Sequence, residues 1–403
     1  MSMPAARPEI LQLGPGLTVR GGISSVERLI VERLGASTAI RHVATMEDGS
    51  AWRKLRVFVR AVSVLRRELR TACGTVRSAL SPAGARARSA AAAGPGVGPA
   101  ADRPGMMLVH IHFSKRGSTV RKVLLAWMTL RAGQPLILHA HSGSFDRFFG
   151  ALPVLARQVI GHVFARADRV IVLSRHWRDF YVQSVGLDPR RIVILSNPVA
   201  IPVAVPERAG RAQVQLLFLG RISGHKGAFD LLRAYATLPE ALRSRTRLVF
   251  AGDGEVEALR AQAHAFGRAV EVHSWVDTTR RDALLASSDI FVLPSYYEGV
   301  PMAMLEAMAH GLAVVSTRVG GIPEVIQDQR EGLLISPGAP AQLREALICL
   351  IENEDRRLAM GRQARQRAQG FDAHRYAARL LNVYEQVLQQ HGCANREIPE
   401  EVM

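Results

Sequence analysis

The first half of the chain alternates short apolar runs with stretches in which apolar residues recur every three or four positions. The first run, Ile10–Leu13, is followed by a glycine-bearing turn and then by a helical pattern from Ile23 to Leu34. A strand followed by a helix in this order opens a βαβ unit. Further strands are predicted at Leu108–His112, Leu136–Ala140, Val170–Leu173 and Ile192–Leu195, with helices around Arg121–Leu130 and Pro153–Ala165.

The second half repeats the alternation after a proline-bearing stretch without periodicity, Asn197–Arg208, which is typical of a linker. Strands are predicted at Gln215–Leu219, Leu248–Ala251, Val270–His273, Ile290–Leu293, Ala313–Ser316 and Leu333–Ile335, and late helices at Leu343–Ile351, Asp355–Ala368 and Ala373–Gln389. We therefore predict an α/β protein of two facing doubly wound, Rossmann-like domains, residues 1–200 and 201–370, with a C-terminal segment 371–403. Such sheets bind ligands at the carboxyl ends of their strands.

Composition narrows the class of protein. The 403 residues are 48% hydrophobic and 22% charged, which is ordinary for a globular protein and excludes disorder and collagen. The three cysteines lie far apart without a C-x-x-C pair, so neither a disulfide framework nor a zinc site is indicated. No run of eighteen apolar residues occurs and no signal-peptide core follows Met1, so we expect a cytoplasmic protein.

The formal net charge of +17 comes entirely from the first half, where residues 1–200 hold 29 basic and 11 acidic residues. Such an excess indicates an anionic partner: nucleic acid, lipid headgroups or a phosphorylated substrate. The densest stretch, 51–77, combines eight basic residues with a helical apolar stripe, so it is either an interfacial membrane helix or a surface helix packed on its own domain. Its membrane- or acceptor-contacting candidates are Arg53, Arg56, Arg60, Arg67 and Arg70. We interpret residues 78–105, rich in glycine and proline, as a flexible insertion.

Three groups of residues at predicted strand ends carry candidate chemistry. Glu298 and Glu306 bracket the start of a helix whose first turn we place at Pro301, where carboxylates suit sugar or ribose hydroxyls and free amides suit an anion. Arg221 and Lys226 lie on a glycine-bearing loop, and two cations at this spacing can grip a diphosphate. The third group places paired glycines in Val319–Glu324 before another helix, as turn residues or for close backbone approach.

These motifs together resemble the donor half of the family-4 retaining glycosyltransferases. The resemblance covers Leu216–Gly338 well and the first half more loosely, through Gly21-Gly22 and the strand-end sequence His139-Ala-His141. It implies the GT-B architecture: a nucleotide-diphospho-sugar bound to the second domain, an acceptor held by the first, and a C-terminal helix crossing back to the first domain.

The resemblance also implies a role for each matching residue. Arg221, Lys226, Gly22 and the Gly299, Val300, Pro301 and Met302 segment would bind the donor diphosphate, and Glu306 the ribose. Glu298 and His141 would lie beside the transferred sugar as the catalytic candidates. The implied reaction retains the anomeric configuration. Because no Asp-x-Asp occurs in the sequence, we expect no metal and no cofactor besides the nucleotide-sugar substrate.

Rival functions remain at this point. A dinucleotide oxidoreductase fails on spacing, because position 19 is Val19 and not the third glycine of G-x-G-x-x-G. A nucleoside-diphosphate-sugar epimerase and a basic nucleic-acid-binding protein stay open, although no nucleic-acid module is evident. If the transferase interpretation holds, we expect a saccharide acceptor, lipid-linked, at the anionic inner face of a bacterial membrane, in exopolysaccharide, capsule or lipopolysaccharide synthesis.

Overall fold

The computed structural model describes residues 9–35, 38–80 and 106–394, and it divides into two compact units. The first unit runs to Val172 and also includes Arg178–Leu195 and the chain from Ala377 onward. The second comprises Leu173–Trp177 and Ser196–Tyr376. The main boundary between the units therefore follows Leu195, slightly before the predicted boundary at residue 200. The last helix begins in the second unit and ends in the first.

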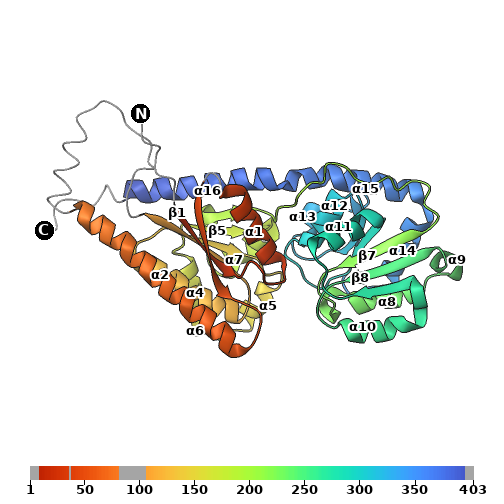
Figure 1. The fold of residues 1–403 in the computed structure, drawn as a ribbon, viewed down its shortest axis with the longest axis horizontal. Coiled ribbons are helices and arrows are strands. Elements are labelled where there is room, and N and C mark those ends of the chain that lie inside the picture. The colour runs from red at the N-terminus through yellow and green to blue at the C-terminus, as the bar shows by residue number, and fades with distance from the viewer. Residues whose placement is uncertain (1–8, 36–37, 81–105, 395–403) are drawn as a thin grey trace, which may run out of the picture. The chain divides into compact units, whose positions relative to one another are not determined.

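A six-stranded parallel sheet forms the first unit, with strand order β2-β1-β3-β4-β5-β6. Its strands are β1 (Glu9–Pro15), β2 (Ala39–Met46), β3 (Met107–Phe113), β4 (Leu136–Ala140), β5 (Arg169–Val172) and β6 (Ile192–Ile194). Its helices are α1 (Gly22–Leu34), α2 (Ala51–Leu80), α4 (Gly117–Arg131), α5 (Phe145–Gly150), α6 (Val154–Phe164), most of α7 (Arg175–Gln183), a 3-10 turn (Pro189–Arg191) and the end of α16 (Ala373–Ala394). In Figure 1, α2, α4 and α6 lie on one side of this sheet and α16 on the other.

The second unit contains another parallel six-stranded sheet, ordered β12-β11-β10-β7-β8-β9. Its strands are β7 (Val214–Leu219), β8 (Thr246–Ala251), β9 (Val270–His273), β10 (Ile290–Leu293), β11 (Ala313–Thr317) and β12 (Gly332–Ile335). Its helices are α8 (Ala228–Ala236), α9 (Glu240–Arg243), α10 (Val256–Ala263), α11 (Thr278–Ser287), α12 (Met302–Ala309), α13 (Ile322–Val325), α14 (Pro340–Glu352) and α15 (Glu354–Ala368), with 3-10 turns at Gly224–Lys226, His264–Ala269 and Gln369–Phe371. The two sheets confirm the predicted doubly wound α/β class.

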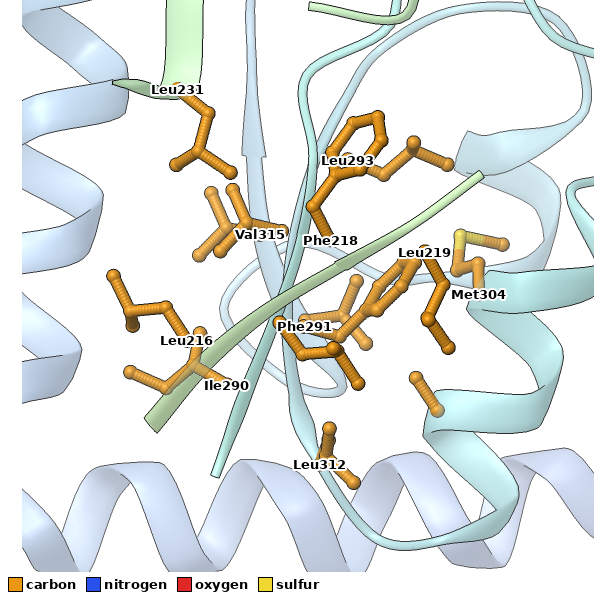
Figure 2. Packing of buried hydrophobic residues seen from close by; sticks show 14 of the residues in the cluster. Leu216, Phe218, Leu219, Leu231, Ile290, Phe291, Leu293, Met304, Leu312 and Val315 are labelled. Carbon is orange, nitrogen blue, oxygen red and sulfur yellow. The ribbon is translucent and has the colours of Figure 1, made fainter. Parts of the chain in front are cut away.

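The central strands of the second unit are buried on both faces, which explains their uninterrupted apolar sequence. Figure 2 shows the packing of Phe218, Phe291 and Met304 between the sheet and its helices, and all three side chains are fully buried. Burial of this kind stabilises a fold by about 25 cal/mol per Å² of apolar surface. The packed core holds the loops at the carboxyl ends of β7 and β10 on rigid supports.

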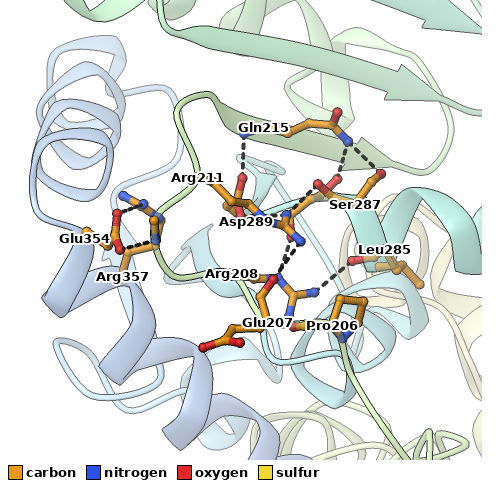
Figure 3. A network of polar contacts seen from close by, with 12 residues as sticks. Pro206, Glu207, Arg208, Arg211, Gln215, Leu285, Ser287, Asp289, Glu354 and Arg357 are labelled. Carbon is orange, nitrogen blue, oxygen red and sulfur yellow. Dashed lines mark hydrogen bonds and ion pairs between the residues drawn. The ribbon is translucent and has the colours of Figure 1, made fainter.

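A polar network lies at the amino-terminal ends of the strands of this sheet (Figure 3). The buried Arg208 guanidinium donates to the backbone oxygens of Ser288 and Leu285 at 2.7 and 3.1 Å. Asp289 accepts from Arg211 at 3.0 Å and from the backbone N–H of Gln215 at 2.8 Å. These bonds tie the linker to the starts of β7 and β10, so the network is structural and lies away from the carboxyl ends of the strands.

Besides the boundary between the units, several details differ from the sequence predictions. The strand β2 was not predicted, because its side chains alternate in exposure and include polar residues. Helix α2 continues to Leu80, so residues 78–80 are helical and not part of an insertion; the rest of that predicted insertion, 81–105, lies outside the described residues. Pro301 is the N-cap of α12 and not part of its first turn, because the helix begins at Met302.

Candidate functional site

Three loops of the second unit pack tightly together at the carboxyl ends of β7, β10 and β11, and glycines make this possible. Gly227 has a left-handed backbone (φ 72°), and a Cβ there would lie 2.3 Å from the carbonyl oxygen of Pro294. Gly320 (φ 54°) would place a Cβ 1.8 Å from the carbonyl oxygen of Glu298. The backbone N–H of Gly321 donates to the carbonyl oxygen of Gly299 at 2.8 Å. The paired glycines therefore allow a close backbone approach, one of the two predicted explanations.

Lys226 and Glu298 meet at the centre of these loops. The Lys226 ammonium lies 2.5 Å from Oε1 of Glu298, and the hydroxyl of Ser295 donates to the same oxygen at 2.8 Å. The Glu298 side chain is only 7% exposed, while that of Lys226 is 23% exposed. A cation held by a buried carboxylate, with part of its surface still open, is suited to bind an anion.

The N-terminus of α12 starts beside this pair. Its N-cap, Pro301, has no side-chain hydrogen bond to the helix, so the first amides lack a capping partner from that residue. The loop before it is held by Asn197, whose side-chain amide donates to the carbonyl oxygen of Val300 at 2.7 Å. The backbone from Gly299 to Met302 is thus fixed in place, and the helix dipole makes its start favourable for negative charge.

Arg221 follows β7 on the same edge of the sheet. Its guanidinium lies 3.5 Å from Oδ2 of Asp253 in the loop after β8, and its side chain is 61% exposed. An exposed pair at this distance is weak. The guanidinium is therefore available to a ligand, and the backbone bond from the Ile222 N–H to the Asp253 carbonyl oxygen, at 2.7 Å, keeps the two loops together.

Glu306 lies inside α12, where Nη1 of Arg281 donates to its Oε1 at 2.8 Å. Burial raises the pKa of Glu306 to about 7, while Arg281 opposes this shift and Asp282 adds to it. The Glu306 carboxyl group is therefore partly protonated near neutral pH. Both its protonated and its ionised form can make hydrogen bonds with hydroxyl groups.

This shifted pKa predicts a pH-dependent contribution to stability. Because the folded-state pKa of Glu306 is raised from 4.5 to about 7, its contribution is fully present below pH 4.5 and is lost as pH rises through 7. We expect the difference in unfolding free energy between wild type and Glu306→Gln to change by about 3 kcal/mol across this window, and to be constant above it. Urea unfolding at several pH values measures this difference, and a difference that does not vary with pH contradicts it.

In the first unit, the two predicted residues lie in the chain that follows β1 and β4. Gly22 is the first residue of α1, after Gly21, whose φ of 143° suits only glycine. His141 follows β4 directly, and its Nε2 lies 2.9 Å from Nδ1 of His112. Burial lowers the pKa of His141 to about 3, so its imidazole is neutral. Gly22 and His141 belong to the first unit, whereas Lys226 and Glu298 belong to the second.

The predicted apolar stripe of α2 divides into two parts. Leu65 and Leu69 are buried, whereas Trp52 is 80% exposed and Leu55 and Val59 are more than half exposed. The arginines proposed for contact with a membrane or acceptor all lie on exposed positions of this helix: Arg53, Arg56, Arg60, Arg67 and Arg70. The C-terminal part of the stripe packs on its own unit and the N-terminal part faces solvent. Among the described residues, none of the helices has the length and apolar character needed to cross a bilayer.

Family models match both halves of the chain. A model described as "Glycosyl transferase 4-like domain" matches residues 21–198, and one described as "Glycosyl transferases group 1" matches residues 207–367. The chain belongs to the family-4 GT-B glycosyltransferases. Membership agrees with the two parallel sheets and favours the transferase interpretation over the epimerase and nucleic-acid alternatives.

Individual relatives are distant. The D-inositol 3-phosphate glycosyltransferase of Salinispora tropica is 27% identical over 317 residues, which cover 70% of this chain and only 64% of that enzyme. The fold resembles HepE of Anabaena, solved in complex with UDP, with a TM-score of 0.67 and 17% identity over 94% of this chain and 100% of that one. It also resembles the lipopolysaccharide outer core galactosyltransferase WaaB, with a TM-score of 0.61 and 17% identity over 94% and 99% of the two chains.

The sequence patterns did not indicate several residues of this candidate site. Ser295 and Asp253 both follow predicted strands, and the Ala251-Gly-Asp253-Gly sequence after β8 was a usable signal for the second. Glu324 turns out to be structural, because its carboxylate accepts the backbone N–H groups of Arg175 and His176 at 2.8 Å each and so caps α7. No local pattern indicates such contacts, which join segments far apart in sequence.

Proposed function

We propose that this protein transfers a hexosyl unit from a nucleotide-diphospho-sugar to a saccharide acceptor with retention of the anomeric configuration. The observation that carries the proposal is the Lys226–Glu298 pair beside the start of α12, whose N-cap Pro301 makes no side-chain cap, at the carboxyl edge of the second sheet. Family membership and the UDP complex of HepE support a nucleotide-sugar as the donor. The proposed roles are those implied by the family pattern, residue by residue.

The donor diphosphate would lie between Lys226, Arg221 and the first amides of α12. As the bond between the sugar and the diphosphate breaks, negative charge develops on the departing oxygen, and the two cations with the helix dipole stabilise it. Glu298 holds Lys226 in position and lies beside the sugar, and Glu306 pairs with the ribose hydroxyls. These cations do the work that other transferases assign to a metal bound by Asp-x-Asp, so we propose a metal-independent reaction.

Retention follows when the acceptor hydroxyl attacks from the face that the diphosphate leaves. A double displacement requires a carboxylate nucleophile on the opposite face of the sugar. Glu298, the nearest acid in the family pattern, is already bound to Lys226 and Ser295. Its role is therefore to bind and position.

The stereochemical outcome tests this function. We expect an α-configured donor to give an α-configured product, detected by proton NMR of the anomeric signal during the first turnovers. The same assay with donor alone, where water is the acceptor, gives an α-configured free sugar. A β-configured initial product contradicts retention.

The part of the proposal that concerns the acceptor rests on exposed side chains of the first unit. Helix α4 packs against α2 and also against α6. Each carries exposed large apolar side chains: Trp52, Leu55 and Val59 on α2, Val120, Leu124 and Trp127 on α4, and Val154, Leu155 and Val159 on α6. We call these nine residues the three-helix apolar surface. Solvent-exposed apolar side chains in such number favour contact with a membrane or another protein.

The positive charge of α2 favours a membrane over another protein as the partner of this surface. The exposed Arg53, Arg56 and Arg60 lie on α2 among the apolar residues, as in interfacial amphipathic helices. Anionic headgroups attract basic residues near the surface with about 1 kcal/mol each. We therefore propose that the protein binds peripherally to the inner membrane and acts there on a lipid-linked saccharide, in bacterial exopolysaccharide, capsule or lipopolysaccharide synthesis.

Charge reversal of these arginines tests the membrane proposal. We expect the triple variant Arg53→Glu, Arg56→Glu, Arg60→Glu to bind vesicles containing anionic lipid about a hundredfold more weakly than wild type, measured by vesicle sedimentation.

The matched control is Arg233→Glu, Arg243→Glu, Arg260→Glu, which changes the net charge equally on surface ion pairs of the second unit. Equal loss in both triple variants, or unchanged binding in the first, contradicts membrane docking through α2.

A further inference from the structure

Four histidines form an array on one face of the first sheet. His110 and His112 are two positions apart on β3, so their side chains lie on the same face of the sheet. His139 lies on β4, and His141 directly follows that strand. The strand register pairs His112 with His139, and the ring centroids of neighbouring members lie 4.2–5.4 Å apart. His141 is at the carboxyl end of the array, where parallel sheets bind ligands. The other three are fully buried behind it.

Hydrogen bonds connect two of these histidines with a residue of β1. The side-chain nitrogen of Gln12 lies 3.2 Å from Nε2 of His112, and Nδ1 of His112 lies 2.9 Å from Nε2 of His141. Both ring nitrogens of His112 are therefore engaged. His141 uses Nε2 for this bond, so Nδ1 is the nitrogen it can offer to a ligand.

The direction of donation follows from the chemistry of the groups. A neutral imidazole has one N–H and one accepting nitrogen. Burial lowers the pKa of His112 and of His141 far enough to keep both neutral at pH 7. The Gln12 amide donates to Nε2 of His112, so His112 carries its proton on Nδ1 and donates it to Nε2 of His141. The proton of His141 must then be on Nδ1.

We propose that His112 is a positioning residue that holds His141 as its Nδ1–H tautomer, with that N–H directed to a hydroxyl of the transferred sugar. The inference rests on the proposed function for the identity of the ligand. It assigns His112 and Gln12, which touch no substrate, to the orientation of His141. A fixed N–H donor costs no reorganisation when the sugar reacts, whereas a histidine free to exchange tautomers presents a lone pair for part of the time.

The geometry of the array favours this role over a metal centre. Ring nitrogens of His110, His112 and His139 lie within 4.8 Å of one another, close enough to consider a trihistidine site. The rings of His110 and His139 are stacked with an interplanar angle of 8°, and Nδ1 of His110 is already 2.8 Å from the hydroxyl of Tyr384. Stacked rings direct their nitrogens side by side, while metal ligands converge on one point.

Two substitutions separate positioning from core packing. His112→Leu removes the bond to His141, and His139→Leu changes an equally buried member whose ring nitrogens have no hydrogen-bond partner among the described residues. We expect kcat of His112→Leu to fall about tenfold with the donor KM within about twofold of wild type, and His139→Leu to keep both values. His112→Asn, whose side-chain nitrogen replaces Nδ1, should recover most of the activity.

The tautomer is measured separately by ¹⁵N NMR of histidine-labelled protein. We expect His141 to be protonated on Nδ1 in wild type and to show mixed tautomers in His112→Leu. A proton on Nε2 of His141 in wild type, equal losses in His112→Leu and His139→Leu, or one equivalent of bound metal lost in both variants overturns the proposal. If wild type transfers no sugar, the proposed function fails, and the NMR result still decides whether His112 sets the tautomer.

Discussion

Replacing Lys226 with alanine is expected to lower kcat/KM for the sugar donor by about a hundred- to a thousandfold. Removal of one preorganised group that stabilises developing charge costs about this much in other enzymes. Lys226 lies 2.5 Å from the buried Glu298 carboxylate, so its position is fixed before a donor arrives. Initial-rate kinetics with wild type and Lys226→Ala measure the effect. Arg233→Ala, which removes an exposed arginine of α8, is the control and should keep wild-type activity.

Loss of activity must be separated from loss of stability, because Lys226→Ala leaves the Glu298 carboxylate, 7% exposed, without its cation. An unpaired buried group costs about 1–3 kcal/mol. The double variant Lys226→Met, Glu298→Gln removes both charges and should recover the melting temperature while remaining inactive. Recovery of activity in that double variant contradicts the assigned role of Lys226.

Gly320→Ala is expected to lower both the stability of the fold and the affinity for the donor. A Cβ at this position would lie 1.8 Å from the carbonyl oxygen of Glu298, so the loop that carries Glu298 must move. The left-handed backbone alone costs an alanine about 1–2 kcal/mol. Together with the displaced loop we expect about 2–4 kcal/mol of lost unfolding free energy and a loss of donor affinity of at least about tenfold. Denaturant unfolding and donor titration measure the two effects.

Gly267→Ala is the matched control for this substitution. Gly267 has nearly the same φ, 53° against 54°, but a Cβ there meets nothing within 4 Å. The control should show the backbone cost without any change in donor affinity. Equal effects of the two substitutions on affinity contradict the role of Gly320 in close packing against the Glu298 loop.

Much of the fold was predictable because buried parallel strands are continuous apolar runs. Residues Leu136–Ala140, Val270–His273 and Ile290–Leu293 were predicted with the bounds that the structure gives. Strand β2 was missed because its residues alternate between exposed and partly buried positions at the edge of the sheet. Edge strands have one open side, so their composition differs less from that of loops.

The candidate site was predictable in part. The spacing of Arg221, Lys226 and Glu298 at strand ends indicated a shared edge, since parallel strands bring their carboxyl ends together. The ion pair between Lys226 and Glu298 joins residues 72 positions apart, and no local pattern indicates it. The bond between His112 and His141 depends on strand register, which the sequence does not state. The exposure of Trp52 also depends on which turns of α2 contact the sheet.

Donor binding in the presence of excess chelator is the measurement that tests the central claim most directly. Titration calorimetry with a panel of UDP-, GDP- and ADP-sugars is expected to show saturable binding of one nucleotide class, unchanged by chelator. That binding should be lost in Lys226→Ala and weakened in Glu306→Ala. Absence of binding to every donor, together with salt-sensitive binding to nucleic acid, would contradict a nucleotide-sugar site on this unit.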